Sequence, residues 1–80
     1  RYGLAPETYK AMYKAQEGRC KICKIEEKYA TRSQLYVDHD HDTGAVRSLL
    51  CQKCNTGLGM FQDSSEFTIA ATTYLKENGK

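Results

Sequence analysis

Four cysteines in two pairs of identical spacing constrain this chain more than any other feature of its sequence. The pairs are Cys20 with Cys23 and Cys51 with Cys54, and two residues separate the members of each pair. Two Cys-x-x-Cys pairs can place four thiolates in a tetrahedron, which is the closed arrangement of a structural zinc site. The intervening segment must loop out and return, at an entropic cost that grows only logarithmically with loop length. We therefore expect a structural zinc ion with no position left for substrate or water.

Three other uses of paired cysteines remain open. They are two disulfides in an exported protein, an Fe–S cluster held by four thiolates, and a thioredoxin-like redox site. A redox site needs one pair within a βαβ pattern, which is not present. The sequence has no apolar run long enough for a membrane span and no signal segment, so we expect a soluble, cytoplasmic protein without a membrane partner. Reducing conditions there favour metal binding over disulfides.

The length of the chain explains why a metal would be needed. Its 80 residues make one domain, residues 1–80, and so short a chain buries too little apolar surface for a comfortable margin of stability. Tryptophan is absent, and the apolar content rests largely on six Tyr and on aliphatic residues. The first residue is Arg rather than Met, as expected for a domain trimmed from a longer protein.

The pattern of apolar and turn residues predicts a small α+β fold. A helix is expected over residues 5–16, because Pro6 suits a first helical position, and Gly18 would end it. After a loop over residues 24–34, short strands over residues 35–37 and 45–50 form a hairpin.

Two further helices are expected after the hairpin. The first begins at Cys51 and runs for about two turns, until Gly57 and Gly59 loosen it. Asp63 and Glu66 resemble a capping box that opens the last helix. The residues of that helix expected to face the core are Phe67, Ala70, Ala71, Tyr74 and Leu75.

Residues 38–42 place three carboxylates and both histidines of the chain in one run, Asp38-His39-Asp40-His41-Asp42. Alternation along a strand would put the aspartates on one face and the histidines on the other. Three carboxylates on one face repel one another unless a cation lies among them. The alternative is a solvated acidic turn at the hairpin tip, which needs no ion.

Asn55 weakens that alternative because it follows the last cysteine, where a zinc ion would tie its helix against the hairpin. A strand carboxylate and a helix amide are oxygen ligands suited to Mg²⁺. The net charge of +2 is too small to indicate a nucleic-acid partner by itself. Basic residues crowd residues 10–32 beside the acidic run, an arrangement that suits a phosphate polymer but is also common as solvated surface charge.

A longer pattern surrounds these residues. It comprises residues 37–44 (VDHDHDTG), 46–55 (VRSLLCQKCN) and 57–59 (GLG), with weaker pieces at residues 2–7 (YGLAPE) and 18–23 (GRCKIC). The pattern resembles the recombination endonuclease VII family, which belongs to the HNH, or ββα-metal, nucleases. The resemblance continues through the terminal helix, so it spans nearly the whole chain.

The resemblance implies a zinc-stapled ββα-metal fold, in which a hairpin and a helix are flanked by N- and C-terminal helices. It implies a metal-dependent endonuclease that hydrolyses phosphodiester bonds in DNA and leaves a 5′ phosphate and a 3′ hydroxyl. Asp38 and Asn55 would hold the catalytic Mg²⁺ or Mn²⁺, and His39 would be the general base. The four cysteines match the zinc ligands of the family. A homodimer is compatible with the resemblance but is not indicated by this chain.

The main alternative is a catalytically silent zinc module that binds DNA or a protein. Asp38, His39 and Asn55 together favour the nuclease, because a pure binding module has no need of that set.

Three neighbouring residues have two interpretations each. Asp40 would orient His39 or lie in solvent, and His41 would assist the site or only pack in the hairpin. Arg47 would grip a backbone phosphate or be an ordinary surface arginine.

Overall fold

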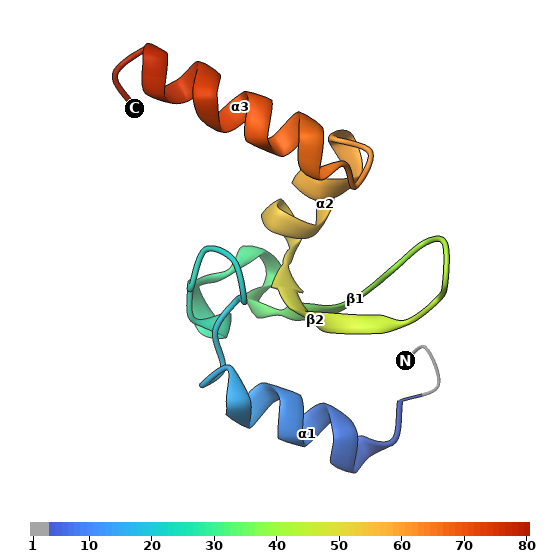
Figure 1. Ribbon diagram of the computed structural model, residues 1–80. Helices are drawn as coiled ribbons and strands as arrows, with labels where there is room; N and C mark the ends of the chain where they lie inside the picture. The colour runs from blue at the N-terminus through green and yellow to red at the C-terminus, as the bar shows by residue number, and fades with distance from the viewer. Residues whose placement is uncertain (1–3) are drawn as a thin grey trace.

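A β-hairpin lies at the centre of the chain, with one helix before it and two helices after it (Figure 1). The computed structural model describes residues 4–80, so Tyr2 and Gly3 of the family-like N-terminal segment lie outside the described residues. The elements in order are α1 (Pro6–Ala15), η1 (Glu27–Tyr29), η2 (Thr31–Ser33), β1 (Leu35–His39), β2 (Val46–Cys51), α2 (Gln52–Met60) and α3 (Ser65–Glu77). The predicted small α+β class is confirmed.

The two strands pair antiparallel, with an irregularity at Asp38. Leu35 is paired with Cys51 and Val37 with Leu49, but the register shifts before the pairing resumes at His39. The extra residue lies in β2, where Arg47 and Ser48 together oppose Asp38, and Val37 and Asp38 of β1 are both buried. The alternation expected across residues 38–42 is therefore wrong, because β1 ends at His39 and residues 41–43 form a turn.

The core is small and is continuous with the cysteines. Cys20 and Cys51 are completely or almost completely buried beside Leu35 and Leu49. The other core residues are Ala30, Val37 and Leu50, and side chains from α1 and Leu58 of α2 pack against them. A core of this size supports the expectation that something other than apolar burial contributes to stability.

The helix α1 and its end match the predicted helix closely. It ends at Ala15, and Gly18 follows in the left-handed region with φ +67°. The Gly18 N–H donates to the Tyr13 carbonyl at 3.0 Å, and a Cβ on Gly18 would lie 2.9 Å from the Tyr13 hydroxyl oxygen. Both the backbone conformation and the close approach therefore require glycine.

The segment expected to be a plain loop contains the short helical turns η1 and η2. Glu27 in η1 holds the segment in place, because its carboxylate accepts a hydrogen bond from the Tyr13 hydroxyl at 3.0 Å. The same carboxylate accepts the N–H of Leu35 at 3.3 Å, at the start of β1. One side chain thus joins α1, η1 and the hairpin.

The two C-terminal helices differ from the prediction. The helix α2 begins at Gln52, one residue after Cys51, and continues through Gly57 and Gly59 to Met60. Ser64, and not Asp63, caps α3, since its hydroxyl accepts the Phe67 N–H at 3.1 Å.

The predicted core face of α3 is also wrong. The helix extends away from the hairpin (Figure 1), and none of its residues is buried. Phe67, Tyr74 and Leu75 are 49%, 66% and 48% exposed, and the two alanines do not reach the core either. No helix within residues 4–80 is long and apolar enough to cross a membrane.

Gln16, just after α1, generates the first prediction, because its side chain bonds directly to β2. Its amide nitrogen donates to the carbonyls of Arg19 and Leu49 at 2.8 and 2.9 Å, and its amide oxygen accepts the Leu49 N–H at 2.9 Å. Gln16→Ala removes the side-chain partner of the Arg19 carbonyl and of the Leu49 N–H, while the Leu49 carbonyl keeps the Lys21 N–H, and should lower the free energy of unfolding by about 1–3 kcal/mol. Denaturant titration measures this change.

Lys10→Ala, at an exposed position of α1, is the control and should change stability by less than about 0.5 kcal/mol. Equal stability of the two variants would contradict the role given to Gln16.

Candidate functional site

The four cysteines come from two separate segments that the fold brings together. Cys20 and Cys23 lie in a tight turn after α1, in which the Cys20 N–H donates to Ile25 and the Lys24 N–H donates back to Cys20, at 3.0 and 3.1 Å. Cys51 is the last residue of β2, and Cys54 lies in the first turn of α2. A hydrogen bond of 3.1 Å from the Lys21 N–H to the Leu49 carbonyl holds the first segment against β2.

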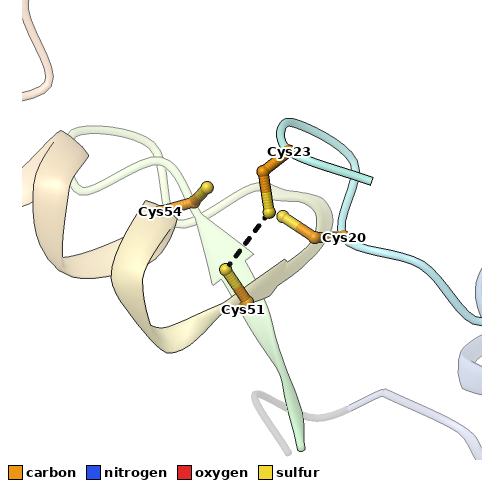
Figure 2. Close-up of side chains that lie close together, drawn as sticks. All are labelled: Cys20, Cys23, Cys51 and Cys54. Atoms are coloured by element: carbon orange, nitrogen blue, oxygen red, sulfur yellow. Dashed lines mark hydrogen bonds between the residues drawn. The ribbon is translucent and has the colours of Figure 1, made fainter. Parts of the chain in front are cut away.

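The sulfur atoms converge on one point (Figure 2). All four lie within 4.8 Å of one another, and the Cys23 and Cys51 sulfurs are 3.7 Å apart. In a tetrahedral zinc site with Zn–S bonds of about 2.3 Å, the sulfurs would be about 3.8 Å apart. None of the four cysteines forms a disulfide. The cluster could therefore hold a metal such as zinc.

The thiols of the cluster differ in how readily they ionise. Burial of Cys20 opposes its thiolate, but backbone N–H groups of Cys51, Cys23 and Ile22 outweigh burial and lower its pKa to about 6. Burial raises the pKa of Cys54, and hydrogen bonding to the neighbouring thiols raises it further. Thiols crowded together in this way resist simultaneous ionisation. A divalent cation between them would favour all four thiolates through its positive charge.

Asp38 is the buried carboxylate of the acidic run. It is 6% exposed, and the Arg47 Nε donates to its Oδ2 at 2.6 Å. The other end of the Arg47 guanidinium donates to both oxygens of Asp63, each at 3.0 Å. The hydrogen bonds to Asp38 and then to Asp63 raise the pKa of Arg47 above its usual value. Arg47 is therefore not an ordinary surface arginine but the centre of an ion network.

The rest of the run lies at or near the hairpin tip. The Asp40 Oδ1 accepts the backbone N–H groups of Asp42 and Thr43 at 2.8 and 3.1 Å, which lowers the pKa of Asp40. This carboxylate oxygen shapes the turn. The rings of His39 and His41 lie with their centres 4.9 Å apart. Asp42 is exposed.

Asn55 lies in α2, one residue after Cys54, and is half-buried. The helix α2 directly follows β2, so the cysteine cluster fixes the start of the helix relative to the hairpin that carries Asp38 and His39.

Asp63 is the site residue that sequence reasoning missed. Its spacing from Glu66 suggested a helix cap, but its carboxylate turns back to Arg47 on β2, sixteen positions earlier in the chain. The turn between α2 and α3 places it there, with Gln62 and Asp63 both in the left-handed region at φ 58° and 56°. No local pattern signals such a turn, because neither residue is a glycine.

Comparison with known proteins identifies the family of this chain. A model of the recombination endonuclease VII family matches residues 1–77, which confirms the resemblance in the sequence. Two curated relatives are both called Gene 59 protein. The chain is 46% identical over 77 residues to the one from Mycobacterium phage D29 and 44% identical over 75 residues to the one from Mycobacterium phage L5. These matches cover 95% and 92% of this chain but 46% and 44% of the relatives, so the chain spans less than half of their length.

The cysteine cluster generates the second prediction. A core of this size contributes roughly 3–5 kcal/mol, whereas structural zinc contributes an apparent stabilisation of about 10–16 kcal/mol at neutral pH. Cys51→Ser should therefore leave the protein largely unfolded and depleted of zinc, as measured by circular dichroism and by metal analysis. Ser48→Ala, on the same strand outside the cluster, should stay folded with its zinc. Well-folded native protein that contains no zinc, or contains iron, would overturn this expectation.

Proposed function

This chain belongs to the recombination endonuclease VII family, and on that basis we propose that residues 1–80 form a metal-dependent endonuclease domain that hydrolyses phosphodiester bonds in DNA. Membership of the family indicates a nuclease role. The consecutive order β1, β2 and α2 supports the further assignment to the ββα-metal, or HNH, fold.

The observation that carries the proposal is the buried carboxylate of Asp38. Its Oδ2 is bound by Arg47, while its Oδ1 accepts no hydrogen bond from the part of the chain that the structure describes. A carboxylate this deeply buried needs compensation of its charge, and a cation on the oxygen that Arg47 does not bind would add to it. This donor chemistry fits Mg²⁺ or Mn²⁺, which prefer carboxylate and amide oxygens.

In this proposal Asp38 and Asn55 hold the catalytic divalent ion. An ion bound there would neutralise the charge that develops on the phosphate and on the leaving oxygen. Few protein ligands are needed, because Mg²⁺ keeps several waters and binds substrate phosphate directly. Asn55 supports the assignment through its place in α2, whose first turn the cysteine cluster ties to the end of β2.

His39 is the proposed general base, next to Asp38 at the end of β1. Asp38 is buried whereas His39 is half-buried at the end of the strand, which would let the metal ligand and the base act on different sides of one phosphate. A neutral imidazole would take the proton of the attacking water. The products would be a 5′ phosphate and a 3′ hydroxyl.

We assign the ion in the cysteine cluster as structural zinc with no part in the chemistry. Four thiolates complete the coordination of zinc, so no position remains for a water or a phosphate oxygen. The two metals therefore have separate roles and very different affinities.

The difference in affinity between the zinc site and the proposed catalytic metal site generates the third prediction. Mg²⁺ with few protein ligands exchanges readily, so brief mild chelation should stop DNA cleavage while the zinc content and the circular dichroism spectrum stay unchanged. Added Mg²⁺ or Mn²⁺ should restore cleavage of a supercoiled plasmid. Cleavage that continues undiminished after the removal of exchangeable divalent ions would rule out the mechanism.

The assignment of His39 generates the fourth prediction. Loss of a positioned general base typically slows a reaction by about 10²–10⁴-fold, so His39→Ala should lose activity to that extent. Folding, zinc content and DNA affinity should change little, because none of them needs the imidazole.

Two further variants serve as comparisons for that result. Asp38→Ala should also abolish cleavage and in addition weaken binding of the divalent ion, whereas Asp42→Ala at the exposed hairpin tip should cleave at close to the native rate. A folded, zinc-loaded His39→Ala protein that cleaves DNA like the native protein would favour the silent zinc module.

A further inference from the structure

Arg47 joins two carboxylates from different parts of the fold. Its Nε contacts Asp38 on β1, and its two terminal nitrogens form a paired contact with Asp63 between α2 and α3. A guanidinium is planar and rigid, so holding one end fixes the direction of the donors at the other end. With its outer end on Asp63, Arg47 is held in the orientation that bonds Asp38.

The buried position of Asp38 makes this orientation important. A carboxylate that is 6% exposed needs a charged or hydrogen-bonding partner, and Arg47 is its partner among the described residues. Arg47 holds the carboxylate by Oδ2, so Oδ1 is the oxygen that Arg47 leaves for a cation. A carboxylate with one oxygen bound and one oxygen open is suited to bind a cation through the open oxygen.

Asp63 also changes the charge around Asp38. Arg47 and Asp38 alone would form a neutral pair, which has little attraction for a divalent cation. With Asp63 included, two carboxylates face one guanidinium, and the network is negative. The second carboxylate thus lets Arg47 orient Asp38 without cancelling the attraction of the site for a cation.

The backbone around Asp63 is held in a costly conformation. Gln62 and Asp63 both have positive φ, and each non-glycine residue in that region costs on the order of 1 kcal/mol or more. A hydrogen bond of 2.7 Å from the Asp63 N–H to the Leu58 carbonyl holds the turn, and Ser64 starts α3 immediately afterwards. Strained backbone positions of this kind cluster at active sites and ligand clamps.

We propose that Asp63 is a positioning residue for the metal-binding carboxylate of Asp38 and acts on it through Arg47. This inference rests on the proposed function, because it assumes that Asp38 binds the catalytic ion. It adds a residue from the α2–α3 turn, outside the hairpin and α2, to the working site.

Two substitutions of Asp63 test the proposal. Asp63→Asn keeps an acceptor oxygen but removes the charge, and Asp63→Gly removes the side chain at a backbone conformation that glycine adopts without strain. The matched control is Gln62→Gly, which makes the same backbone change at the neighbouring residue with φ 58° and keeps the Asp63 carboxylate.

The measurements are Mn²⁺ binding to the zinc-loaded protein, followed by electron paramagnetic resonance, and DNA cleavage as a function of Mg²⁺ concentration. Loss of a group that orients a metal ligand typically weakens metal affinity by about 10–100-fold. We expect a loss in that range for Asp63→Gly, a smaller loss for Asp63→Asn and native affinity for Gln62→Gly. The cleavage curve of Asp63→Gly should shift to higher Mg²⁺ by the same factor and recover at high Mg²⁺.

The outcomes separate this inference from the proposed function. If the native protein cleaves DNA and Asp63→Gly binds Mn²⁺ as tightly as the native protein does, the positioning role is wrong and the nuclease assignment stands. Equal losses in Asp63→Gly and Gln62→Gly also overturn it, because the backbone and not the carboxylate would then matter. If the native protein shows no metal-dependent cleavage, the proposed function fails and the positioning role fails with it.

Discussion

The convergence of four thiols is the interaction on which the rest of this structure depends. It joins the turn after α1 to the junction of β2 and α2, and two of its members belong to the buried core. The apolar residues around it are too few to hold three helices and a hairpin in place by burial alone. The position of α2, and with it the position of Asn55 relative to the hairpin, therefore follows from the geometry of the cluster.

A second, polar connection complements the cluster. Arg47 on β2 links Asp38 on β1 to Asp63 beyond α2, so strands and turn share one ion network. The pairing is irregular at this point, with two residues of β2 opposite Asp38, and Asp38 is buried next to Val37. A regular strand would have put one of the two residues in solvent. The carboxylate proposed as metal ligand is thus buried at the irregular pair, opposite Arg47.

The sequence predicted the features that depend on local patterns. Helix α1, its end at Gly18, the hairpin and the cysteine cluster follow from residue spacing and turn chemistry, and the structure confirms them. The features that failed depend on contacts between distant residues. The apolar residues of α3 were expected in a core, but none of its residues is buried and Phe67, Tyr74 and Leu75 are exposed. Asp63 was assigned to a local cap, because nothing near it in the sequence indicates Arg47. The roles of Asp38, His39 and Asn55 remain predictions.

Gln16 has a consequence for solubility as well as for stability. In a two-stranded sheet both strands are edge strands, and an uncovered edge is a template on which another chain can add a strand. The Leu49 N–H and carbonyl on the outer side of β2 are occupied by the Gln16 side chain, and the Lys21 N–H shares the carbonyl. The Gln16 amide thus bonds the same two backbone groups of Leu49 that a neighbouring strand would bond. At Leu49 the edge of β2 is therefore closed to intermolecular pairing without a third strand.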